Sequence, residues 1–104
     1  MEKLLFEKIR EYDTIIIHRH TRPDLDAIGS QLGLAYTLKS VYPNKKIYCV
    51  GDVSRKYSFL GTMDLISDDV FHNALSIICD VAVKSMVSDE RYTLSNEVFV
   101  IDHH

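Results

Sequence analysis

The chain has 104 residues, of which 46% are hydrophobic, and this size and composition are typical of one globular domain or part of one. Lys and Arg total 12 and Asp and Glu total 15, which gives a formal net charge of −3. That balance excludes nucleic-acid binding driven mainly by a basic surface. No membrane span is expected, because the apolar runs reach only about five residues and a spanning helix needs roughly 20.

The sequence argues against secretion and against cysteine cross-links. The amino terminus contains acidic residues and no small-residue cleavage site, so we expect no secretory signal and a cytoplasmic location. Cys49 and Cys79 lie in separate apolar runs. Structural zinc normally needs close Cys pairs, and a disulfide scaffold needs more cysteines. Both cysteines are therefore predicted to be reduced thiols in the core.

Helices and strands alternate in the first half of the chain. Residues 2–12 repeat Leu5, Ile9 and Tyr12 at helical spacing, and the β-branched run 14–17 predicts a strand buried on both faces. A second helix is expected to begin near Asp26 or Ala27 and to be closed by residues 42–44, with a strand over 46–50 after it. The apolar stripe of this second helix comprises Ile28, Leu32, Ala35 and Leu38.

The second half predicts two more strands, over 75–79 and 97–101. One or two short helices are expected within 54–71, and a loop or helical turn around 89–91. Apolar strands that alternate with helical segments indicate an α/β, Rossmann-like and mostly parallel sheet with crossover helices. The carboxyl ends of such strands share one edge, where open parallel sheets bind ligands.

Candidate functional residues follow three of these four strands. His18, His20, Asp24 and Asp26 follow the first, Asp80 follows the third, and Asp102, His103 and His104 follow the fourth. Carboxylates brought together repel one another unless a cation lies between them, and two divalent ions sharing a carboxylate can bind a phosphate and activate water. Imidazoles mixed with carboxylates suit manganese, iron or zinc better than magnesium alone.

Several of these residues also have plainer interpretations. Asp26 could be only a helix N-cap, His18 is better explained as a buried, hydrogen-bonded side chain, and His72 as a surface residue. The pair His103-His104 could be a tag remnant, although it directly follows an apolar strand and Asp102. Taken together, the residues at three strand ends favour a metal site.

The three groups resemble the motifs of the DHH phosphoesterase superfamily. The first motif is the run 20–30, beginning His20-Thr21-Arg22-Pro23-Asp24-Leu25-Asp26; the second is Asp80 of Ile78-Cys79-Asp80; the third is Asp102-His103-His104. The longer strings 18–31, 12–16 and 100–104 look like the branch of bifunctional oligoribonucleases and 3′-phosphoadenosine 5′-phosphate phosphatases. The resemblance covers essentially the whole chain.

The resemblance implies two divalent ions, most simply Mn²⁺, and a role for each motif residue. By analogy His20 and Asp24 bind one ion, Asp26 and His103 bind the other, and Asp80 bridges both and so takes part in catalysis. His104 would be a catalytic residue that contacts the substrate phosphate, with Asp102 orienting its neighbours. The implied reaction is phosphoester hydrolysis by a water that bridges the metals. The implied substrates are short oligoribonucleotides or a phosphorylated nucleotide.

Two departures from the family pattern accompany the resemblance. Val81 and Val83 stand where this branch usually has polar residues, which removes a hydroxyl and an amide near the metals. A fourth aspartate motif and a C-terminal substrate-binding domain are absent, so residues 1–104 are interpreted as the incomplete N-terminal portion of a DHH domain. We therefore expect weak or no activity from this chain alone. A non-catalytic metal- or nucleotide-binding fragment is the alternative, and the sequence leaves the oligomeric state open.

Overall fold

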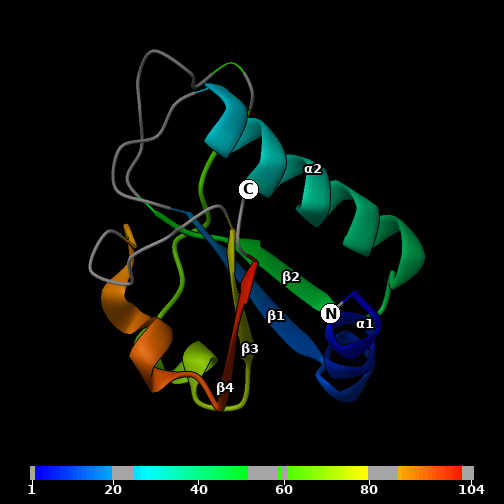
Figure 1. Cartoon of the computed structure of the whole chain (residues 1–104). Coiled ribbons are helices and arrows are strands. Elements are labelled where there is room, and N and C mark those ends of the chain that lie inside the picture. Colours follow the sequence, from blue (N-terminus) through cyan, green and yellow to red (C-terminus); the bar gives the residue numbers. More distant parts are fainter. Residues whose placement is uncertain (1, 20–24, 52–58, 60, 80–86, 102–104) are drawn as a thin grey trace.

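The computed structural model describes residues 2–19, 25–51, 59, 61–79 and 87–101. In chain order the elements are α1 (Glu2–Glu11), β1 (Thr14–His18), α2 (Leu25–Val41), β2 (Lys46–Cys49), η2 (Asp68–Phe71), β3 (Leu75–Cys79), η4 (Glu90–Leu94) and β4 (Glu97–Ile101), where η2 and η4 are 3₁₀-helices. The predicted α/β alternation is confirmed (Figure 1).

The four described strands form one parallel sheet in the order β2-β1-β3-β4. From β1 the chain passes through α2 to β2 on one side, and β3 then pairs on the other side of β1. The strand order therefore reverses between β1 and β3. In open parallel sheets, the crevice beyond the carboxyl ends at such a reversal is the usual ligand site.

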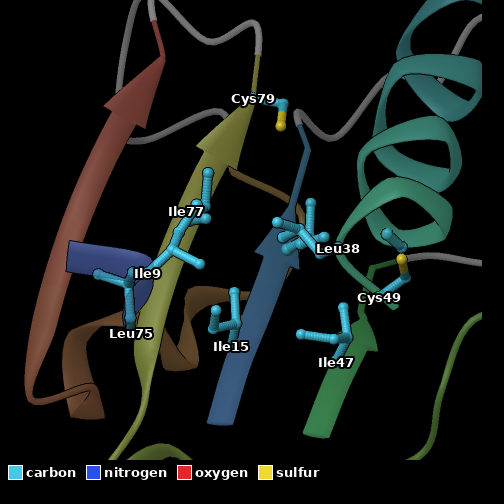
Figure 2. Close-up of a cluster of buried hydrophobic side chains, with 10 residues drawn as sticks. Ile9, Ile15, Leu38, Ile47, Cys49, Leu75, Ile77 and Cys79 are labelled. Carbon is cyan, nitrogen blue, oxygen red and sulfur yellow. The ribbon is translucent and has the colours of Figure 1, made fainter. Parts of the chain in front are cut away.

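The main core lies between the sheet and the two α-helices. Ile15 and Ile17 of β1 form one buried cluster with Ile9 of α1 and with Ala35 and Leu38 of α2. Figure 2 shows Ile9, Ile15 and Leu38 in this cluster. The predicted stripes therefore explain how the helices pack, although Leu32 is only half-buried. Burying each large aliphatic side chain contributes about 1.5–3 kcal/mol to folding, so these helices are held mainly by their apolar faces.

The opposite face of the sheet has its own smaller core. Because successive side chains of a strand point to opposite faces, Ile16 joins Val50, Phe71 and Ala74 rather than the helices. The Arg91 guanidinium joins η4 to η2. Its Nη2 donates to Asp89 Oδ2 at 2.8 Å, its Nη1 donates to the Ile66 carbonyl at 2.7 Å, and it lies over the Phe71 ring. One or two short helices were predicted within 54–71. In the described part of that region, the structure has one complete helical turn, η2.

Both cysteines are buried and free, as predicted. Cys49 ends β2 and Cys79 ends β3, and β1 lies between these two strands (Figure 2). Burial raises the pKa of the Cys49 thiol to about 12, so this thiol stays protonated at neutral pH. Cys49 therefore packs as a small apolar side chain, and its protonated thiol is a poor nucleophile.

Candidate metal centre at the carboxyl edge of the sheet

The strand register aligns the approaches to the three sequence motifs. His18 of β1 pairs with Ile78 of β3, and Ile78 pairs with Val100 of β4, so these residues form one row across three strands. Counting two residues along the sequence from this row gives His20, Asp80 and Asp102. The first residues of all three motifs thus follow the same edge of the sheet at equal sequence separation.

The predicted ligands themselves lie outside the described part of the chain. This applies to His20, Asp24, Asp80, Asp102, His103 and His104, and also to Val81 and Val83. Asp26 lies in the first turn of α2, which begins at Leu25, but its side chain is not among those described. Among the described residues no group of three or more His, Cys, Asp or Glu side chains could hold a metal ion. The convergence of the predicted ligands thus stays a prediction.

His18 is structural, as the sequence interpretation favoured. Its side chain is fully buried, and its Nε2 lies 2.9 Å from Ser76 Oγ, which in turn lies 2.5 Å from Ser95 Oγ. The ring packs beside Phe71 and edge-on to Tyr92. Burial lowers the pKa of His18 to about 4, with the Asp89 carboxylate opposing that effect, so the imidazole is neutral at physiological pH. His72, by contrast, is exposed.

We expect the buried His18 to make folding sensitive to acid. Between its ordinary pKa of 6.5 and its folded value of about 4, the unfolded chain binds a proton that the folded chain does not. The stabilisation is complete above pH 6.5 and is lost as the pH falls towards 4, by about 3 kcal/mol at 1.36 kcal/mol per unit. Denaturant unfolding from about pH 8 to pH 4, with a chelator present, measures this free energy.

His18→Gln should lose that part of the pH dependence, because the variant has no imidazole to protonate. His72→Gln is the matched control, since the side chain of His72 is exposed, and it should unfold with the wild-type pH profile. If His18→Gln and the wild type show the same fall in the free energy of unfolding, the neutral buried state of His18 is wrong.

Gln31 joins helix α2 to the carboxyl ends of β1 and β2. Its side chain is fully buried, and its Nε2 donates to the carbonyl of Ile17 at 2.7 Å and to that of Val50 at 2.9 Å. Its Oε1 is buried without a hydrogen-bond partner among the described residues. Sequence analysis included Gln31 in the string 18–31 but gave it no role, although a signal existed: it lies three positions after Ile28 and four before Ala35, within the apolar stripe.

Arg19 is a second buried polar residue that was missed. Its side chain is 1% exposed, and it immediately precedes the first motif. The backbone of Gly51 makes room for it: a Cβ at this position would lie 3.1 Å from the guanidinium carbon of Arg19, and the φ of Gly51 is +139°. A permanent positive charge is therefore buried beside the carboxyl end of β2, and in the sequence it directly precedes a motif rich in carboxylates.

A cavity of about 700 Å³ lies at the other end of the sheet. It is lined by residues 11–14, Asn44, Lys46, Asn73 and Asn96, which are at or just before the starts of the strands. This is the amino edge, whereas the three motifs follow the carboxyl edge. The cavity is thus separate from the predicted metal site. No helix in the described ranges is long and apolar enough to cross a membrane.

Comparison with known proteins identifies a family. The model of the DHH family, N-terminal domain, matches residues 14–104. The chain is 43% identical over 104 residues to the bifunctional oligoribonuclease and PAP phosphatase NrnA of Bacillus subtilis, covering all of this chain and 33% of that protein. It is 43% identical over 102 residues to the probable NrnA of Streptococcus mutans, covering 98% of this chain and 33% of the relative.

A more distant relative gives the same picture. The NrnA of Mycoplasma genitalium is 33% identical over 102 residues, which cover 92% of this chain and 32% of that protein. The chain thus spans about a third of the length of the relatives it matches.

Proposed function

Because the chain belongs to the DHH family, we propose that it is the N-terminal part of a metal-dependent phosphoesterase that hydrolyses short oligoribonucleotides, 3′-phosphoadenosine 5′-phosphate, or both. The observation that carries this proposal is the register row of His18, Ile78 and Val100, with one motif two residues after each. The reversal of strand order between β1 and β3 supports the same location.

The donor set of the motifs fits divalent transition-metal ions. Three carboxylates and two imidazoles supply hard oxygen and borderline nitrogen ligands, a combination that suits Mn²⁺. In this proposal His20 and Asp24 hold one ion, Asp26 and His103 hold the other, and Asp80 holds both. When bound, the two ions would supply acidity to a water and positive charge to the substrate phosphate, which is the chemistry needed to form a P–O bond to water and break the ester P–O bond.

The protein's own residues would orient the substrate and the metal ligands. His104 would contact the scissile phosphate, and Asp102 would orient the neighbouring imidazoles from behind. The chain's net charge of −3 makes attraction of a polyanionic substrate by the general field weak. Binding would therefore depend on local contacts at the carboxyl edge, among them the metal ions and the loops that follow the strands.

The test is hydrolysis by a chimera in which residues 1–104 replace the matching third of the Bacillus subtilis relative. With Mn²⁺, the chimera should release mononucleotides from a short oligoribonucleotide or phosphate from 3′-phosphoadenosine 5′-phosphate. A chelator should stop the reaction and added Mn²⁺ should restore it. A chimera that binds Mn²⁺ without hydrolysing either substrate would instead support a non-catalytic metal- or nucleotide-binding role. Metal binding alone does not separate the two, because both require it.

A further inference from the structure

We propose that Gln31 is a positioning residue for the metal centre, and this inference rests on the proposed function. Gln31 is not one of the predicted metal ligands. It instead connects the end of β1 and the first turns of α2, which flank the first motif in the chain, with the end of the neighbouring strand β2.

The hydrogen bonds of Gln31 define this role. The same Nε2 amino group donates one hydrogen to the Ile17 carbonyl and the other to the Val50 carbonyl, at 2.7 and 2.9 Å. Ile17 lies three residues before His20 in the sequence, and Val50 directly follows β2. Both donor positions are thus used to join neighbouring strand ends, and the side chain that joins them belongs to the helix.

The first turns of α2 are held against the sheet by the same face. Ala27 and Ile28 are buried with Gln31, and these three positions lie on one side of the helix. The backbone of Asp26 directly precedes this packed face. Fixing Gln31 therefore fixes the distance between the end of β1, which leads to His20 and Asp24, and the start of α2, which carries Asp26.

An amide at position 31 is unexpected within an apolar stripe. A leucine or methionine at position 31 would suit the apolar stripe better, since Gln31 leaves Oε1 buried without a partner among the described residues, and such an atom costs free energy. The two hydrogen bonds that the amide donates therefore point to a role in orientation rather than in stability. The Ile17 carbonyl also accepts from Val50 N–H, at 3.1 Å, so this hydrogen bond between β1 and the end of β2 does not depend on the amide, whereas the Val50 carbonyl would lose the Gln31 donor.

The variant that tests the role is Gln31→Met, which keeps the length and approximate volume of the side chain and removes both donors. Mn²⁺ affinity of the chimera that carries residues 1–104 is measured by electron paramagnetic resonance of the free ion, without any substrate. We expect at least about a tenfold loss of affinity, the usual range when a group that orients metal ligands is removed.

Leu38→Ala is the matched control. Leu38 is buried near the other end of α2, so the substitution removes core packing from the same helix far from the carboxyl edge. Under conditions in which both variants are folded by circular dichroism, Leu38→Ala should retain wild-type Mn²⁺ affinity. If Gln31→Met also retains it, or if the two variants lose affinity equally, the positioning role is wrong. If the chimera with the Bacillus subtilis relative binds no Mn²⁺ even at millimolar concentration, the proposed function itself fails.

Hydrogen exchange in the wild-type protein provides a second test, which does not require the Gln31→Met variant to fold. Coupling between two sites is reciprocal, so if the hydrogen bonds of Gln31 favour metal binding, metal binding must strengthen them by the same factor. Hydrogen exchange of the Gln31 side-chain amide, followed by NMR with diamagnetic Zn²⁺, should slow by about tenfold at saturation. Unchanged exchange with saturating Zn²⁺ would overturn the inference even if Gln31→Met did not fold.

Discussion

Replacing Asp80 with alanine should reduce Mn²⁺-dependent hydrolysis by the chimera by roughly a thousandfold or more, equivalent to about 4 kcal/mol of transition-state stabilisation. Asp80 directly follows Cys79, the last residue of β3, and β3 is the strand beside the reversal in strand order. As the proposed bridge it holds both ions, so its loss disturbs both metals and the attacking water together. Single replacement of His20, Asp24, Asp26 or His103 should each cost less.

The measurement is kcat/KM for a short oligoribonucleotide with saturating Mn²⁺, alongside Mn²⁺ stoichiometry. Asp80→Asn separates charge from shape, because the amide keeps the size of the side chain but loses the negative charge that attracts both ions. Asp69→Ala is the matched control: Asp69 is an exposed aspartate of η2, and its loss should leave kcat/KM unchanged. Near-normal hydrolysis by Asp80→Ala would rule out the bridging role.

The second large effect concerns the 104-residue chain expressed alone. We expect it to bind Mn²⁺ weakly and to hydrolyse substrate at least about a thousandfold more slowly than the chimera, because substrate positioning contributes up to several kcal/mol to catalysis. The chain spans about a third of the length of its relatives, and the rest of the chimera would supply that positioning. His103 and His104 would also be terminal residues in this experiment, and ordering each backbone residue costs roughly 1–2 kcal/mol.

This second comparison requires equal metal loading. Single-turnover assays of the chain and the chimera, both with Mn²⁺ far above its dissociation constant, separate weak metal binding from slow chemistry. A 104-residue chain with the Asp80→Ala substitution provides the background rate. Equal turnover by the unmodified chain and the chimera would show that the additional two-thirds of the relative is dispensable for catalysis.

Local sequence patterns were sufficient for the elements of the fold. The β-branched run Ile15-Ile16-Ile17 predicted a strand buried on both faces, and all three residues are fully buried. The stripe through Ile28, Ala35 and Leu38 predicted the buried face of α2. Such predictions succeed because hydrophobic periodicity is a local property of the chain. The region 54–71 was harder, since its apolar residues follow neither period, and the described part contains only a short 3₁₀-helix beyond residue 61.

The sequence by itself also determined the family, because the three motifs occur in order across the chain, and it identified the candidate ligands by their position after apolar strands. The tertiary structure alone decided the strand order, the register that puts His18, Ile78 and Val100 in one row, and the partners of the buried polar residues. Gln31 reaches carbonyls 14 and 19 residues away, and His18 reaches Ser76 across 58 residues. Contacts at such separations depend on how the strands are arranged, and no local pattern encodes that arrangement.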